Sequence, residues 1–115
     1  MKRSVLIIVS SDPRTSGRPA EAVRMAAGLS THGRLAVTLC LRGRALDVFR
    51  TSAEDLVDGD HFEDYLPILA GVGTIGIVGD LTEVRGENLG SLKLERLSED
   101  ELEKRISSSD RTIRF

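Results

Sequence analysis

The chain has 115 residues, of which 40% are hydrophobic and 30% charged, and its formal net charge is −2. This length and balance are typical of one soluble globular domain, which we expect to cover residues 1–115. The charge gives no basic surface of the kind that binds nucleic acid or an anionic membrane, so neither partner is expected.

The first apolar run, residues 5–9, is too short for a secretion signal or a membrane span, and we therefore expect a cytoplasmic protein. A single cysteine excludes an internal disulfide. The one cysteine and the two distant histidines do not have the spacing of zinc ligands, so no metal is expected. No cofactor is expected either.

Residues 5–9 read Val-Leu-Ile-Ile-Val, which predicts a strand buried on both faces and placed at the centre of a parallel sheet. A polar loop over residues 10–17 follows, and Pro19 then opens a helix predicted over residues 18–31. The loop thus joins the carboxyl end of a strand to the amino end of a helix. In open α/β sheets, ligands bind at that point.

The remaining pattern alternates strands with helices, which predicts a parallel α/β sheet with right-handed crossovers. A short helical or irregular piece is expected over residues 45–49, a surface loop over 51–59, and an ambiguous segment over 87–97. The Ser98–Glu101 pair predicts a capping box. Strands are predicted at residues 35–41, 74–78 and 112–115, and helices from residue 60, with a kink at Pro67, and over residues 99–107.

Three glycines, Gly71, Gly73 and Gly76, match the spacing of the dinucleotide-binding fingerprint. That fingerprint requires a strand before it and a helix after it, whereas these glycines lie between a helix and a strand. The pattern therefore favours a helix end and close packing, not a dinucleotide site.

Several polar residues follow the predicted strands and are expected to meet at one edge of the sheet. A helix amino end and guanidinium groups there would favour a small anion. The scarcity of aromatic residues gives a flavin few stacking partners, and a phosphoacceptor site lacks a lysine at a strand end. The alternative for Arg85 is a surface ion pair with Glu83 or Glu87. The candidate ligand-binding residues are Ser11, Asp12, Arg14, Ser16, Arg42, Asp80, Arg85 and Gly86.

Cys40 is the only thiol that could act as a nucleophile. Its apolar strand favours a buried core cysteine with a raised thiol pKa. Arg42 and Arg44 lie close to it in sequence and would instead favour a reactive thiolate. Both interpretations stay open on the sequence alone.

The chain resembles the DsrE/DsrF-like sulfur-relay family, which includes TusD-type subunits. The resemblance rests on Pro13, the Arg85–Gly86 pair, and the segments 22–29, 62–69 and 109–115. It implies a three-layer α/β/α fold with a mainly parallel five-stranded sheet, and assembly into homotrimers or homohexamers, or with related subunits.

The resemblance also implies a catalytic cysteine a few residues before the Arg-Gly pair, where it would carry sulfur as a persulfide. Leu81 stands four residues before Arg85, and residues 75–97 contain no cysteine. A leucine has no nucleophilic lone pair, so transfer at that site is not expected. Two hypotheses follow: a non-catalytic member that assembles and binds a small anion, or a sulfurtransferase that uses Cys40.

Overall fold

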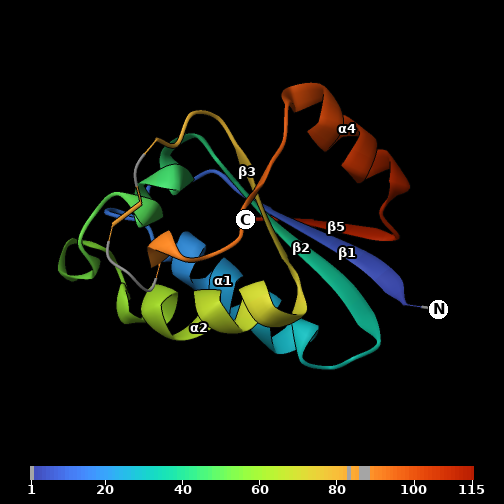
Figure 1. Cartoon of the computed structure of the whole chain (residues 1–115), viewed down its shortest axis with the longest axis horizontal. Coiled ribbons are helices and arrows are strands. Elements are labelled where there is room, and N and C mark those ends of the chain that lie inside the picture. Colours follow the sequence, from blue (N-terminus) through green and yellow to red (C-terminus); the bar gives the residue numbers. More distant parts are fainter. Residues whose placement is uncertain (1, 83, 86–88) are drawn as a thin grey trace.

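The computed structural model describes residues 2–82, 84–85 and 89–115. Its centre is a five-stranded sheet in the order β4-β3-β2-β1-β5, in which every neighbouring pair is parallel (Figure 1). The fold class expected from the sequence is therefore confirmed. The strands are β1 (Arg3–Val9), β2 (Leu35–Arg42), β3 (Thr74–Val78), β4 (Glu95–Arg96) and β5 (Arg111–Arg114).

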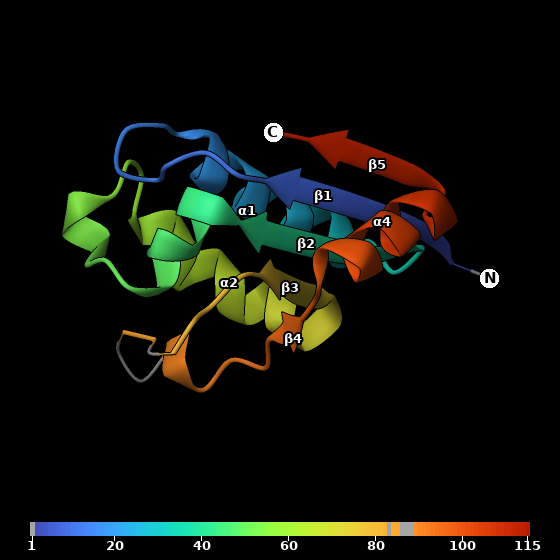
Figure 2. The same ribbon diagram turned by 90° about the horizontal axis from the view of Figure 1, so that it is seen from above.

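Helices cover both faces of this sheet and make three layers (Figure 2). Helices α1 (Arg18–Ser30) and α2 (Asp60–Val72) pack side by side on one face, and α4 (Glu99–Ser108) lies on the other. Alternate residues of β1 serve the two layers: Val5, Ile7 and Val9 join the larger core with α1 and α2, while Leu6 and Ile8 pack with Leu102 of α4. This alternation explains why a run of five apolar residues forms a strand.

The predicted place of the first strand is wrong. The central strand is β2, and β1 lies between β2 and β5, so β3 pairs with β2 and not with β1. The error has a physical reason: strands at both positions are covered by helices on two faces, so their apolar runs look alike. The parallel pairing of β1 with β2 agrees with the crossover helix predicted between them.

Most predicted elements are found close to their expected bounds. β3 has the predicted bounds, α1 ends one residue early, and β5 begins one residue early. The helix predicted from residue 60 is found as α2 and continues past Pro67 to Val72. In the described part, no helix is both long enough and apolar enough to cross a membrane.

The less regular segments fold into short elements. The 3₁₀ helix η1 (Gly43–Phe49) covers the piece expected to be helical or irregular, and η2 (Ala53–Asp55) lies within the predicted surface loop. The ambiguous segment supplies β4. The predicted capping box is present at the start of α4, where the Ser98 hydroxyl accepts a hydrogen bond from the Glu101 backbone N–H at 3.1 Å.

Candidate functional site

The carboxyl ends of β1, β2 and β3 meet at one edge of the sheet, because the three strands are parallel and adjacent. Arg42 is the last residue of β2, and the loops after β1 and β3 carry the other candidate residues that the structure describes. Gly86 lies outside the described residues. The others fall into two groups on different sides of this edge: Arg42 on the α4 side, and the loop residues with Arg85 around η1.

A cavity of about 550 Å³ opens at this edge beside the start of α4. Arg42, the last residue of β2, provides its positive charge. The Arg42 guanidinium donates from Nε to Ser10 Oγ at 3.3 Å and from Nη1 to Glu99 Oε2 at 3.3 Å. The cavity is lined by Ser10, Arg42, Gly43, Val78, Gly79, Leu97, Ser98 and Glu99.

Two lining glycines keep the cavity open. Gly43 has φ of +58° and Gly79 has φ of +126°, values that other residues rarely adopt. A Cβ added at Gly79 would also lie 3.0 Å from a methyl of Leu46. Sharp turns after β2 and β3 therefore require glycine, and the lack of side chains leaves room beside Arg42.

The amino end of α4 contributes little attraction for an anion. The Glu101 carboxylate accepts a hydrogen bond from the Ser98 backbone N–H at 3.0 Å, and this bond is the main reason that the pKa of Glu101 is lowered. Glu99 and Asp100 add negative charge in the same turn. Any anion held in the cavity must therefore rely on Arg42.

The first loop is held together by its own bonds. Asp12 accepts hydrogen bonds from the Arg14 backbone N–H at 2.9 Å and from Arg14 Nε at 3.2 Å, which together lower the pKa of Asp12. Ser16 Oγ accepts the Arg18 backbone N–H at 3.1 Å. The Ser11 hydroxyl is buried and has no hydrogen-bond partner in the described part of the chain.

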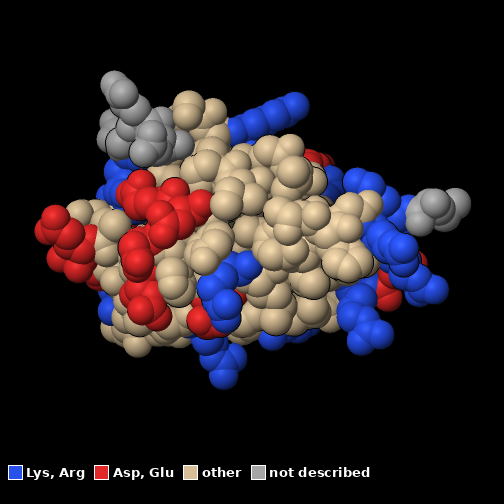
Figure 3. Space-filling view, turned by 90° about the horizontal axis from the view of Figure 1, so that it is seen from below, with Lys and Arg blue, Asp and Glu red and all other residues tan. Residues whose placement is uncertain are grey.

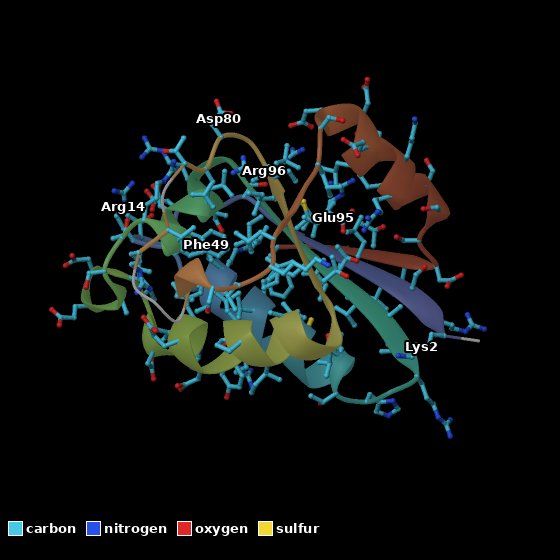
Figure 4. All side chains as sticks on the ribbon, viewed as in Figure 1. Lys2, Arg14, Phe49, Asp80, Glu95 and Arg96 are labelled. Atoms are coloured by element: carbon cyan, nitrogen blue, oxygen red, sulfur yellow. The ribbon has the colours of Figure 1, made fainter. Side chains whose placement is uncertain are left out.

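A chain of ion pairs then ties this loop to η1. Arg14 Nη2 donates to Asp47 Oδ2 at 2.8 Å, and Arg50 Nη2 donates to Asp47 Oδ1 at 2.8 Å. Arg50 also reaches the backbone oxygen of Asp80 at 3.5 Å, whereas the Asp80 side chain projects away from the molecule (Figure 4). Arg14 is thus neutralised by two carboxylates, and the expected pocket shared by Arg14 and Arg85 gains no free cation from it.

Arg85 pairs with a residue that the sequence analysis did not consider. Its Nη1 lies 2.6 Å from Glu63 Oε1 on α2, and its backbone N–H donates to the Phe49 carbonyl at 2.6 Å. Glu83 and Glu87, the partners weighed earlier, lie outside the described residues. The Nε and Nη2 atoms of Arg85 are buried without a hydrogen-bond partner in the described part. Arg85 therefore anchors its loop between η1 and α2.

Neither position that could carry sulfur presents a nucleophile. Cys40 is fully buried in β2, packed with Leu97 and Leu102 beneath α4, and burial raises the pKa of its thiol to about 11. Leu81 packs its side chain into the larger core. Among the described residues, no group of three or more His, Cys, Asp or Glu residues could hold a metal ion.

Ser10, Ser98 and Glu99 line the cavity but are not among the ligand-binding residues expected from the sequence. Ser10 directly follows a predicted strand, which is a signal that could have included it. Ser98 and Glu99 were recognised only as a helix start. They reach Arg42 because β4 pairs with β3 and so brings the start of α4 to this edge, a pairing that a two-residue strand does not reveal.

The comparisons with known proteins agree with the fold. A crystal structure of the YchN protein from E. coli superimposes with a TM-score of 0.74 over 100% of both chains, at 18% sequence identity. No protein-family model matches the sequence, and no curated protein matches it. At this identity the likeness shows the α/β/α fold alone.

Proposed function

We propose that this protein is a non-catalytic, DsrE-like protein of the sulfur-relay type that binds a small anion at the carboxyl edge of its sheet. The observation that carries the proposal is the Arg42 guanidinium in the cavity of about 550 Å³. Sulfate, thiosulfate and phosphate match it, because a planar guanidinium donates two parallel charge-assisted hydrogen bonds to oxygens of one anion.

An anion must compete with Glu99 for Arg42. That ion pair spans 3.3 Å, and the Glu99 side chain is 68% exposed. Exposed pairs of this kind are worth about 0–1 kcal/mol, so an anion that displaces Glu99 from Arg42 gives up little stabilisation. The carboxylate can therefore swing into water when an anion enters, and Ser10 Oγ offers a further hydroxyl beside the guanidinium.

A non-catalytic role follows from the two positions of interest. The Cys40 thiol is buried with a raised pKa, and Leu81 offers no sulfur. Both observations weigh against a persulfide carrier at Cys40. In this proposal the protein acts in an assembly with copies of itself, as a trimer or hexamer, or with related subunits that carry the reactive cysteine. Its cytoplasmic location stays a prediction.

Calorimetry on the wild-type protein and two variants tests the binding. Sulfate, thiosulfate and phosphate should bind the wild-type protein with a dissociation constant in the millimolar range or below. Arg42→Gln should weaken binding at least about tenfold, because it removes the charge-assisted bonds. Arg44→Gln is the matched control, since Arg44 is an exposed arginine two residues away that does not line the cavity.

The control should bind like the wild-type protein. Equal loss in both arginine variants, or no binding of any of the three anions at millimolar concentration, would overturn the ligand-binding proposal and leave only the assembly role.

A further inference from the structure

The face formed by α1 and α2 exposes apolar side chains that the fold itself does not use. Met25 is 42% exposed, Ile68 45% and Val72 52%. The last six residues of α2, from Pro67 to Val72, contain no charge. Seen from below, this face shows a broad uncharged centre (Figure 3). An exposed apolar centre between charged ends is typical of an interaction site.

Two exposed glycines leave the surfaces of α1 and α2 without a side chain at their positions. Gly28 of α1 and Gly71 of α2 are exposed within their helices, and a Cβ added at either would meet nothing within 4 Å. Glycine inside a helix is less favourable than alanine, because it loses more backbone freedom on folding. The folded chain gives no packing reason for either glycine, whereas a helix of another molecule could approach closely there.

Opposite charges flank the apolar centre. Acidic side chains gather at one end of the face, where α2 begins, and basic ones gather at the other, with a further basic group near the middle of the lower part (Figure 3). Asp60 and Asp64 belong to the acidic end, and Lys2 and Arg34 to the basic end. None of these four side chains forms an ion pair with another described residue.

The basic end is also hollowed. A cavity of about 680 Å³ there is lined by Lys2, Arg3 and Arg34, with Leu29 and Leu35 adding apolar surface. Lys2 lies at the opposite end of the molecule from Arg14 (Figure 4). The basic end thus offers both charge and space to an acidic, protruding segment.

We propose that two copies of this chain associate face to face through α1 and α2, about a two-fold axis that lies in the interface and runs across the long direction of the molecule. This arrangement places the acidic end of each copy on the basic end of the other and apolar centre on apolar centre. Each contact is made twice, as an isologous interface requires. The inference rests on the assembly part of the proposed function and names the surface that serves it.

The face formed by α1 and α2 is large enough for a standard protein–protein interface. It spans the longest and the shortest dimension of the molecule, 39 and 25 Å. A standard interface buries about 800 Å² on each partner, which a face of these dimensions can supply. A centre of aliphatic side chains with charged ends also matches the usual composition of a specific interface.

Analytical ultracentrifugation tests this interface. Ile68→Arg places a charge in the apolar centre and should raise the dissociation constant of the two-fold contact at least about tenfold. Glu103→Arg, on the exposed side of α4 in the opposite layer, is the control and should leave the assembly unchanged. Circular dichroism on each variant confirms that it is folded.

Charge reversal gives a sharper test. The pair Asp60→Lys and Asp64→Lys makes both ends of the face positive, and the pair Lys2→Glu and Arg34→Glu makes both ends negative. Each double variant alone should associate at least about tenfold more weakly than the wild-type protein, because like charges then meet. A mixture of the two should associate again as a mixed dimer.

The outcomes separate the two proposals. If the wild-type protein assembles and the Ile68→Arg variant and both charge-reversal variants assemble equally tightly, this interface is overturned. The proposed assembly then remains. A stable 12.5 kDa wild-type monomer at micromolar concentration would overturn both the interface and the assembly of the protein with copies of itself. Anion binding to Arg42 is measured independently of either result.

Discussion

Arg42 is the residue on which the binding account depends, since its guanidinium sits between the Ser10 hydroxyl and the exposed carboxylate of Glu99. Arg14, Arg50 and Arg85 are tied to carboxylates that hold loops together. These arginines therefore differ in their surroundings. Arg42 lines a cavity and has a weakly held partner, whereas the ion pairs of the others connect segments of the chain.

Replacing Glu99 by glutamine should strengthen anion binding. The change removes the competing carboxylate and one negative charge from the cavity, and an exposed ion pair is worth up to about 1 kcal/mol. We expect the dissociation constant for sulfate to fall about two- to five-fold in calorimetry. Asp100→Gln removes the same charge from the next residue and should have a smaller effect. A weaker affinity in Glu99→Gln would show that Glu99 helps to bind the ligand.

Cys40 should react slowly with alkylating reagents. A pKa of about 11 leaves the thiol almost wholly protonated at pH 7, and its full burial blocks access. We expect iodoacetamide to modify the native protein at pH 7 at least about a hundred times more slowly than a free cysteine, whose pKa is about 8.5. Modification at the rate of a free thiol would restore Cys40 as a candidate sulfur carrier. The same reaction in denaturant serves as the control.

At the scale of elements, a reciprocal contact fastens β5 to β1. The Asp110 carboxylate accepts hydrogen bonds from the Ser4 backbone N–H at 2.7 Å and from Ser4 Oγ at 3.2 Å. The Asp110 backbone N–H donates in turn to Ser4 Oγ at 2.9 Å. Because β5 is only four residues long, this contact fixes its register at the point where the strand begins.

This contact predicts a loss of stability in acid. The backbone hydrogen bond from Ser4 is the main reason that the pKa of Asp110 lies below the usual value of an aspartate. A carboxyl group with a lowered pKa stabilises the fold fully above its unfolded pKa, and the contribution is lost as the pH falls through the folded pKa.

Asp110→Asn should therefore destabilise the protein at pH 7 and lose less stability than the wild-type protein between about pH 5 and pH 2. Urea unfolding at several pH values measures this difference. The role of Asp110 would be contradicted if the free energy of unfolding fell equally in both proteins between about pH 5 and pH 2. Asp100→Asn, an exposed acidic residue on α4, provides the comparison.

The sequence predicted the positions of helices and strands along the chain better than it predicted which strands are neighbours in the sheet. Apolar periodicity placed α1 and β3 because each buries a regular stripe or run, and the Ser98–Glu101 spacing placed the start of α4. The sequence pattern does not predict the order of the strands, because β1 and β2 are both buried on two faces and have similar apolar runs. The candidate residues were expected at the carboxyl edge of the sheet, and the described ones lie there. Their charge partners, Asp47 and Glu63, come from distant segments that only the packing of η1 and α2 brings near.

For the whole molecule, the distribution of charge separates the two proposed functions. The carboxyl edge holds Arg42 in a cavity beside α4, while the face of α1 and α2 carries opposite charges at its two ends (Figure 3). The open edges of the sheet are short, with two residues in β4 and four in β5, and short edge strands do not favour pairing through the sheet. The helix layer is therefore the better surface for assembly, and it leaves the cavity on the α4 side accessible.

Anion binding at Arg42 is tested most directly by a nuclear magnetic resonance titration of the protein with sulfate and thiosulfate. The titration follows the shifts of the backbone amides and of the arginine Nε–H groups. The account predicts saturable shifts at the Arg42 Nε–H and at the amides of Gly43, Gly79 and Glu99, and their loss in Arg42→Gln but not in Arg44→Gln. Shifts confined to Arg3 and Arg34 at the opposite edge of the sheet, or no saturable shifts at all, would contradict it.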